Sequence, residues 1–491
     1  MLHDLLVIGG GINGAGIARD AAGRGLAVML VEKDDLASAT SSWSSKLIHG
    51  GLRYLEQYEF RLVREALQER EVLLRLAPHI IRPLAFVLPH DASMRPAWMI
   101  RAGLWLYDHL GGRVTLPASR HVAFPHPQYS AGLKAELRSG FVYSDCRVDD
   151  SRLVVANAMS AREKGAAILT RTRFAGARRV DGAWDAAIAR ADGTRETVRA
   201  KALVNAAGPW VVDVLDGVEG DRITDRVRLV KGSHIVVPRV HSQPHAYILQ
   251  NPDKRVVFVI PYEEEFSLIG TTDVQVASVG EARAITPEET RYLLEAANRF
   301  LEVPLVQRNV FSSYAGVRPL YDDGSPNPSE VTRDYVLKLD RGSGAEPPLL
   351  TVFGGKITTY RRLAEEALAK LAPFFPAAGG EWTAHEALPG GEAGPALSPS
   401  QLEARYARLG AAFLAGILRR HGSRTPQVLG EATQRADLGR DFGAGLTARE
   451  IEYMRAHEWA LTAEDVLWRR TKCGLHMDAA GRAAVREHMG R

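Results

Sequence analysis

Cysteine is scarce in this sequence, and long hydrophobic runs are absent from it. Cys146 and Cys473 are the two cysteines, and they form no CxxC pair. We therefore expect neither a disulfide framework nor a structural zinc site, and a reducing compartment fits best. No stretch reaches about 18 consecutive apolar residues, so no membrane-spanning helix is expected. Any contact with a membrane would be peripheral.

A strong charge of either sign is also missing. The formal net charge is only +4, although arginine is abundant. Nucleic-acid-binding proteins usually show a much stronger basic bias, so no nucleic-acid partner is expected. The small positive balance is compatible with an anionic substrate or with an anionic membrane surface, and whole-chain charge does not separate the two.

The chain is long enough for several domains. A length of 491 residues predicts two or three of them. The strand-like run 4–8 begins almost at the first residue and leaves no room for a signal peptide. Residue patterns predict helices over 57–77 and 96–112, whereas the elements of 83–145 stay unordered. The Pro- and Gly-rich stretch 387–400 predicts a linker, and mostly helix-forming sequence follows it.

Residues 4–32 predict a strand, a Gly-rich turn, a helix and a second strand. The turn contains Gly9, Gly11 and Gly14 in a GxGxxG pattern. These glycines allow a tight turn, the approach of a pyrophosphate and close helix packing. Glu32 ends the second strand, about 20 residues after the glycine turn. A carboxylate at this position can accept hydrogen bonds from an unphosphorylated ribose. It would repel the phosphorylated ribose of NADP. The alternative is a purely structural turn, and the motif alone does not separate FAD from NAD.

A hydroxyl-rich segment follows, and it favours FAD. Small hydroxyl side chains cluster near the expected diphosphate, at Thr40, Ser41, Ser42, Ser44 and Ser45. Such a run is often an ordinary loop, but this one leads into a His-Gly-Gly-x-Arg-Tyr sequence. The two glycines permit close approach of the backbone to a planar ligand. His49, Arg53 and Tyr54 would then lie near its reactive end.

Several motifs along the chain carry a resemblance to a known family. They are IGGGINGAGIARDAAGRG, TSSWSSKLIHGGLRYLE, NAAGPW, GSHIVVP, IGTTD, GVRPL and VFGGKITTYRRLAE. Together they resemble the FAD-dependent glycerol-3-phosphate dehydrogenases of the D-amino-acid-oxidase-like flavoprotein superfamily. The motifs occur in family order between residues 4 and 365, and the C-terminal region is similar to the family's helical domain.

The resemblance implies a non-covalently bound FAD and adds further cofactor contacts. Besides the glycine turn and the hydroxyl run, these are Lys46, Arg173, Gly208, Gly355, Lys356 and Thr358. Gly208 follows a strand that would end against the cofactor. Gly355 opens a helix whose N–H groups could hold the electron-rich edge of the reduced flavin. The plain alternatives are a strand-to-helix turn at Gly208 and a helix cap at Gly355.

The resemblance also implies sn-glycerol 3-phosphate as the substrate, which would be oxidised to dihydroxyacetone phosphate. A small dianion needs several cations, and arginine suits bidentate phosphate contacts. His49 is expected to take the proton of the C2 hydroxyl and Arg318 to stabilise the alkoxide, although His49 could contact the phosphate instead. The implied substrate contacts are Arg53, Tyr54, Thr271, Arg318, Lys356 and, as a weaker one, Arg333.

The resemblance further implies that electrons pass to ubiquinone or menaquinone. It places the enzyme, as an expected homodimer, on the cytoplasmic face of the cell membrane. Two segments suit an interface: 356–372, and the aromatic run of 96–112 with Trp98, Met99, Leu104, Trp105, Leu106 and Tyr107. Each could instead be an ordinary core-facing helix. We see no inserted segment of the kind that related oxygen-reacting oxidases carry, which favours a dehydrogenase.

The predicted fold class is therefore α/β, with a Rossmann-like FAD-binding domain, an inserted antiparallel-sheet substrate domain and an all-helical C-terminal domain. Their expected ranges are 1–80, 145–230 and 340–386; 81–144 and 231–339; and 401–491. Two rival functions stay open. One is a superfamily member that oxidises an amine or a different 2-hydroxy acid, which the excess of arginine and lysine disfavours. The other is a flavin- or NAD-binding regulatory module without turnover.

Overall fold

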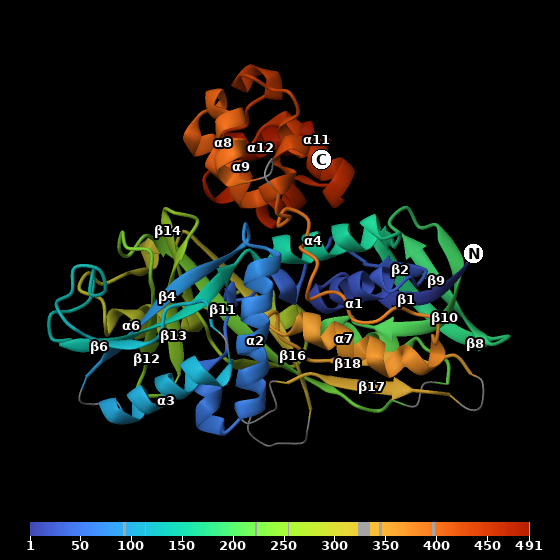
Figure 1. Ribbon diagram of the computed structural model, residues 1–491, viewed down its shortest axis with the longest axis horizontal. Coiled ribbons are helices and arrows are strands. Elements are labelled where there is room, and N and C mark those ends of the chain that lie inside the picture. Colours follow the sequence, from blue (N-terminus) through green and yellow to red (C-terminus); the bar gives the residue numbers. More distant parts are fainter. Residues whose placement is uncertain are drawn as a thin grey trace.

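A computed structural model describes residues 1–91, 95–112, 114–220, 223–253, 255–322, 334–342, 346–394 and 398–490. Two β-sheets lie side by side, and a separate group of C-terminal helices lies above them (Figure 1). The predicted α/β class with a helical C-terminal domain is confirmed. None of the described helices is both long enough and apolar enough to cross a bilayer.

The first sheet contains the N-terminal βαβ unit and is parallel at its centre. Its strands run in the order β17 (Val336–Asp340), β18 (Leu349–Phe353), β10 (Arg195–Asn205), β1 (Leu2–Ile8), β2 (Val28–Val31) and β7 (Ala167–Leu169). From β18 to β7 the pairing is parallel. Antiparallel pairs add β17 at one edge, and join β9 (Ala183–Arg190) to β10 and β8 (Thr172–Val180) to β9. Five parallel strands therefore run in the same direction through the sheet.

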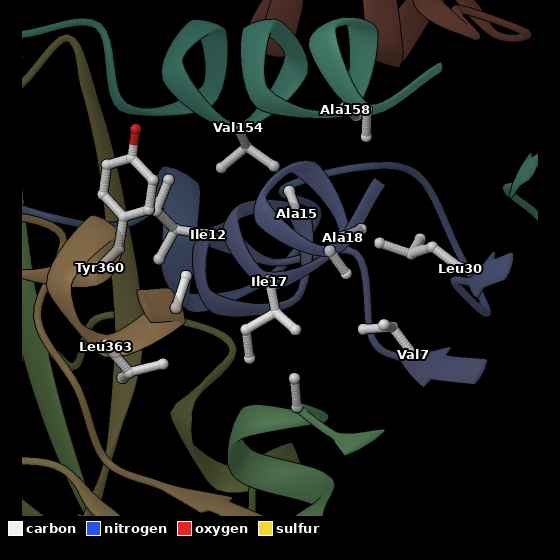
Figure 2. Close-up of a cluster of buried hydrophobic side chains, with 14 of the residues drawn as sticks. Val7, Ile12, Ala15, Ile17, Ala18, Leu30, Val154, Ala158, Tyr360 and Leu363 are labelled. Atoms are coloured by element: carbon white, nitrogen blue, oxygen red, sulfur yellow. The ribbon is translucent and has the colours of Figure 1, made fainter. Parts of the chain in front are cut away.

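Helix α1 (Ile12–Gly23) is the central helix of this half. Its small residues let it pack closely against α4 (Asp150–Glu163) and α7 (Tyr360–Leu371). Figure 2 shows α1 between Val154 and Ala158 of α4, Tyr360 and Leu363 of α7, and Val7 and Leu30 of the strands. Gly25, with φ of +86°, follows the helix in a left-handed conformation that glycine adopts without strain.

The second sheet is antiparallel apart from one pair. Its order is β15 (Val274–Val276), β11 (Val227–Pro238), β14 (Phe266–Gly270), β13 (Val256–Tyr262), β12 (Ala246–Gln250), β4 (Ile81–His90), β6 (Ser139–Val148) and β3 (Leu47–Ile48). β16 (Ser312–Tyr321) pairs with β11, and β5 (Arg120–Ala123) with β6. The exception is the parallel pair of β12 and β4. This sheet is the predicted antiparallel layer.

Helices cover the second sheet where apolar periodicity predicts them. α2 (Phe60–Leu76) and α3 (Ala97–Leu110) confirm the helices expected over 57–77 and 96–112. α6 (Pro287–Asn298) begins with a capping box, because Thr286 Oγ1 accepts a bond from Glu289 N at 3.2 Å and Glu289 Oε2 accepts one from Thr286 N at 3.0 Å. The short helix α5 (Val211–Asp216) follows β10.

The C-terminal helices have a core of their own and are tied to α4 and the first sheet by buried ion pairs. Arg152 of α4 pairs with Glu458 at 2.5 Å, and Arg470 pairs with Asp35 at 2.7 Å. A π-helical turn spans 465–470. The α-helices are α8 (Pro399–Arg405), α9 (Ala411–His421), α10 (Thr425–Leu429), α11 (Ala448–Glu458) and α12 (Ala479–His488).

The sheets divide the chain slightly differently from the predicted domain ranges. β3 lies within 1–80 but pairs with β6 of the second sheet, and β17 begins before residue 340 but pairs with β18 of the first. A two-residue strand has too little periodicity to be assigned from sequence. The segment 83–145, unordered at the sequence level, forms most of β4, all of α3 and β5, and most of β6.

Candidate active site

A cavity opens at the edge of the first sheet where its parallel strands end. Its walls come from the segments that directly follow β1, β2, β10 and β18. They include Gly9, Glu32, Gly208 and Gly355, all four predicted cofactor contacts. Open doubly wound sheets bind nucleotides at this edge, because the helix N-termini and flexible turns meet there. The cavity, with about 940 Å³ of space open to solvent, is the expected dinucleotide site.

The glycine turn has the geometry that a dinucleotide needs. Gly9 has φ of +110°, and a Cβ on it would lie 2.6 Å from the Ala206 carbonyl oxygen. A Cβ on Gly14 would lie 1.9 Å from the Gly9 carbonyl oxygen. Neither position therefore accepts another residue, and the N-terminus of α1 is brought into the cavity wall through Gly11 and Ile12. Its N–H groups and partial positive charge suit a diphosphate.

Glu32 braces this turn from the end of β2. Its two carboxylate oxygens accept hydrogen bonds from Gly10 N at 2.7 Å and Asp34 N at 2.8 Å. Burial raises the pKa of the Glu32 carboxyl, and these two backbone bonds oppose that rise. The side chain also lines the cavity, so it is placed where it could contact a ribose, as predicted.

The cavity residues fit an adenine dinucleotide that ends in a flavin. Asn13 Oδ1 is buried beside Gly355 and accepts no hydrogen bond from the residues that the structure describes, so the wall holds an acceptor for a ligand N–H or O–H. On the opposite side Lys33 Nζ lies 3.4 Å from the centre of the Trp210 ring. Arg173 and Thr40 line the same space.

A second, larger cavity adjoins the first one. Its wall carries all five described residues that the sequence analysis assigned to the substrate, together with His49. The two cavities share Ile12, Thr40, Ser41, Pro319 and Gly355. A ligand that fills the first cavity would therefore extend its far end toward the predicted substrate residues. Those residues are Arg53, Tyr54, Thr271, Arg318 and Lys356.

Arg318 of β16 is held rigidly in the second cavity. Its guanidinium pairs with the Asp273 carboxylate and donates from Nη2 to Thr271 Oγ1 at 3.1 Å. Gly232 on β11 makes room for this group, because a Cβ there would lie 2.6 Å from Arg318 Nη2. The side chain is only partly buried, so it keeps donors for an anion.

His49 lies in the same wall on a turn that is fixed from behind. Its backbone N–H donates to Thr358 Oγ1 at 3.3 Å, and the next N–H, of Gly50, donates to the Tyr107 hydroxyl at 2.8 Å. Tyr107 in turn donates to Asp145 Oδ2 at 2.7 Å. Burial lowers the pKa of the His49 imidazole, and the positive charge of Lys356 adds to this, so the ring is neutral near pH 7.

Two more cations lie in the wall of the second cavity. Lys356 Nζ lies 3.8 Å from the centre of the Tyr54 ring, which is a cation–π contact between two residues of this wall. Arg53 is exposed to solvent and lines the cavity. Lys356 and Arg53 belong to two different predicted motifs, so the cations of the cavity come from separate segments.

Several of the predicted cofactor residues do not line the first cavity. Ser42 and Lys46 lie outside both cavities, because Ser42 Oγ donates to Ala37 O at 2.5 Å and Lys46 Nζ pairs with Asp150 at 2.9 Å. Both side chains brace the hydroxyl-rich loop, and their expected contacts with the cofactor stay predictions. Ser45 lines the second cavity. Arg333 lies outside the described residues.

Sequence reasoning left several site residues without a role. His234 lines the second cavity, stacks on Tyr314 and shares a hydrogen bond of 2.9 Å with Ser45 Oγ. Asp273 and Trp210 are the pairing partners of Arg318 and Lys33. All three belong to the quoted motifs GSHIVVP, IGTTD and NAAGPW. The motifs indicated which segments form the site, but only the folded chain shows which of their side chains line the cavities.

Comparisons with known proteins agree with this geometry. Residues 4–361 match the family described as FAD dependent oxidoreductase, and residues 382–489 match the C-terminal domain of alpha-glycerophosphate oxidase. A glycerol-3-phosphate dehydrogenase of Pseudomonas aeruginosa is 54% identical, over 99% of this chain and 95% of that protein. A D-erythritol 1-phosphate dehydrogenase of Brucella abortus is 53% identical, over 99% and 97%. The chain also resembles the FAD complex of a Bacillus halodurans glycerol-3-phosphate dehydrogenase, with a TM-score of 0.75, 26% identity and coverage of 100% and 94%.

Proposed function

Since the chain belongs to the FAD-dependent oxidoreductase family, we propose that it oxidises sn-glycerol 3-phosphate to dihydroxyacetone phosphate. One observation carries the proposal. Arg53, Arg318 and Lys356 line a cavity that continues the predicted flavin site, and His49 lies in the same wall. Cations from separate segments suit a phosphate dianion, and a neutral imidazole suits an alcohol.

The three cations bind and orient the substrate. Arg318 offers a planar fork of N–H donors, held in place by Asp273 and Thr271. Lys356 and Arg53 add positive charge in the same cavity wall, where they would attract the phosphate. Fixing the phosphate in this way positions the C2 carbon of the substrate against the cofactor cavity, which lowers the entropic cost of the reaction.

His49 acts as the base for the C2 hydroxyl. Its lowered pKa keeps the ring neutral near pH 7, so one ring nitrogen can accept the proton of the hydroxyl. Arg318 stabilises the oxygen that gains negative charge as the proton leaves. When bound, FAD supplies the acceptor for the hydride from C2.

Electrons would then pass to a membrane quinone, ubiquinone or menaquinone. The surface that supports membrane contact is the outer side of α3, where Trp98 is 69% exposed and Trp105 is 61% exposed. Tyr58, 79% exposed, follows the 3-10 turn that packs against α3. Exposed aromatic side chains near basic residues such as Arg101 suit a bilayer interface at the cytoplasmic face.

The two segments that the sequence suggested for a membrane interface differ in how exposed their apolar side chains are. Within the aromatic run, Leu104 and Tyr107 are buried in the core, and Trp98, Met99 and Trp105 alone are exposed large hydrophobic residues. The segment 356–372 contributes α7, whose apolar side packs on α1 and is buried. We therefore keep α3 as the proposed contact and drop 356–372.

A second substrate is favoured by one specific observation, the 53% identity to a D-erythritol 1-phosphate dehydrogenase. That compound also carries a terminal phosphate and a secondary hydroxyl, so the same cations and base would serve it. The test is the ratio of kcat/KM for the two phosphates, with a water-soluble ubiquinone analogue as acceptor. We expect glycerol 3-phosphate to exceed erythritol 1-phosphate at least about tenfold, the scale of one mismatched carbon in a pocket. If kcat/KM for glycerol 3-phosphate is equal to or below that for erythritol 1-phosphate, glycerol 3-phosphate is not the preferred substrate.

A further inference from the structure

A second cluster of cations lines a cleft that is separate from both site cavities. The cleft lies where the second sheet meets the C-terminal helices. Arg82 of β4, Arg147 of β6 and Arg419 of α9 contribute to its wall, and so does Lys472. Its acidic lining residues are Asp149, Glu263 and Glu264. The proposed oxidation uses none of these groups.

Two of the arginines face an unfavourable arrangement. Arg82 and Arg147 are directly opposite each other in the antiparallel pair of β4 and β6. Like charges in directly opposite positions destabilise a sheet, and both side chains are partly buried. Burial lowers the pKa of each guanidinium, and for Arg82 the charges of Arg147 and Arg419 lower it further. Holding these two cations together therefore destabilises the folded protein.

The carboxylates of the cleft are already engaged by other cations. Glu264 pairs with Arg419, and Glu263 lies 3.7 Å from Arg419 Nη2. Asp149 pairs with Lys472. Arg82 Nε donates to the His79 carbonyl at 3.2 Å, but across the described ranges neither Arg82 nor Arg147 has a carboxylate within 4 Å. Both guanidinium groups therefore form no ion pair of their own among the described residues, although, against the effect of burial, the nearby charges of Glu263 and Glu264 raise the pKa of Arg147.

We propose that this cleft is a binding site for a dianionic phosphate group, carried by free phosphate or a small phosphate ester, with Arg82 and Arg147 as its principal ligands. Guanidinium forks bind phosphate oxygens in pairs, and one dianion between two forks would turn repulsion into attraction. Arg419 would add a contact from α9, so the bound anion would join the sheet to the helical domain.

A free ligand is favoured over a lipid headgroup by the position of the cleft. Figure 1 shows α9 in the upper, C-terminal group of helices and α3 at the opposite side of the molecule. The exposed aromatic side chains proposed for membrane contact lie on α3. One flat bilayer surface would therefore not reach both places.

The first experiment counts phosphate sites by calorimetric titration of the FAD-loaded enzyme with inorganic phosphate. We expect wild type to bind at two sites, one in the substrate cavity and one in the cleft. Arg147→Gln should weaken the cleft site at least tenfold and leave the other unchanged. The control Arg190→Gln removes an arginine from an exposed pair with Glu196 and should match wild type. Identical isotherms for all three proteins, or an adventitious weak site only, would overturn the proposal.

A second measurement separates a ligand site from a purely structural role. In phosphate-free buffer, Arg147→Gln should raise the unfolding temperature of the holoenzyme, because it removes the repulsion with Arg82. Phosphate should raise that temperature in wild type and more weakly in the variant. A variant that is less stable than wild type in both buffers contradicts the proposal. Neither readout needs turnover, so failure of the proposed oxidation would leave this test intact.

Vesicles identify the source of the phosphate. Wild type and Arg147→Gln should sediment equally with phosphatidylglycerol vesicles and equally with phosphatidylcholine vesicles. If phosphatidylglycerol binding falls in the variant while inorganic phosphate binding does not, the ligand is a lipid headgroup and the free-phosphate site is overturned.

Discussion

The guanidinium of Arg318 pairs with the carboxylate of Asp273 in the wall of the proposed substrate cavity. With Thr271 as its second acceptor, the group is fixed in one orientation toward the cavity. Arg318→Gln should therefore raise KM and lower kcat, with a loss of about 100-fold or more in kcat/KM. Steady-state kinetics check this, with Arg190→Gln as the control at an exposed ion pair. Near wild-type kinetics would remove Arg318 from the site.

The neutral His49 ring predicts an acid limb in the pH profile. Burial and Lys356 lower its pKa, whereas Asp145 opposes the shift. The neutral base therefore predominates above a pKa that lies below about 6.5, and kcat/KM should fall as the pH drops through it. His49→Gln should lower kcat about 100-fold and abolish this limb. The exposed His121→Gln is the control; an acid limb that survives in His49→Gln assigns the titration elsewhere.

Glu32 predicts a specific effect on cofactor affinity. Glu32→Ala removes the acceptor for Gly10 N and Asp34 N together with the expected ribose contact. A hydrogen bond to a charged group contributes about 1.5–3 kcal/mol, so the Kd for FAD should rise at least about tenfold. Titration of the apoprotein with FAD measures it, alongside Glu196→Ala at an exposed pair. Unchanged affinity would show that the glycine turn alone suffices.

The buried ion pairs of the helical domain predict a dependence of stability on pH. Burial alone would raise the pKa of Glu450, but the Arg420 charge and its neighbour His421 lower it to about 2. A carboxyl with a depressed pKa stabilises fully above its unfolded pKa near 4.5 and loses this contribution as the pH falls toward 2.

Glu450→Gln should therefore destabilise the fold near pH 7 by about 3–5 kcal/mol, since Arg420 would stay buried without its anion. The difference from wild type should shrink as the pH is lowered below 4.5. Thermal unfolding across this range provides the measurement. Glu431→Gln, whose side chain is 92% exposed, should show neither effect. A constant difference at all pH values would contradict the assigned pKa.

The exposed aromatic side of α3 predicts how the protein binds vesicles. Trp98→Ser combined with Trp105→Ser should reduce sedimentation with vesicles at least about tenfold, because two large apolar side chains no longer enter the interface. Turnover with a water-soluble acceptor should stay unchanged. Val303→Ser, at a site 74% exposed on another segment, is the control. Equal binding of all variants would place membrane contact elsewhere.

Much of the fold follows from local sequence signals. The turn at Gly9 and the acid Glu32 predicted the βαβ unit and the edge at which its ligand binds. Thr286 and Glu289 form the local capping box at the start of α6. These features depend on residues within one or two elements, where conformational preference and hydrogen bonding act locally.

The rest depends on contacts between distant segments. Lys46 stands among predicted cofactor contacts but pairs with Asp150, and Asp273 gains its role only because β16 brings Arg318 beside it. Nor could periodicity separate the buried Tyr107 from the exposed Trp105 two residues earlier in α3. The residue pattern predicted the helix and its amphipathic character, but tertiary packing decides which side of the helix faces the core.

The central claim concerns a cofactor cavity and a substrate cavity that meet at Thr40, Ser41 and Gly355. Its most direct test is anaerobic titration of the purified holoenzyme with sn-glycerol 3-phosphate, followed by a quinone, with the flavin absorbance monitored. We predict that the yellow absorbance bleaches with formation of dihydroxyacetone phosphate and returns when the quinone is added. A flavin that stays oxidised with glycerol 3-phosphate and every other phosphate ester tested would contradict the account.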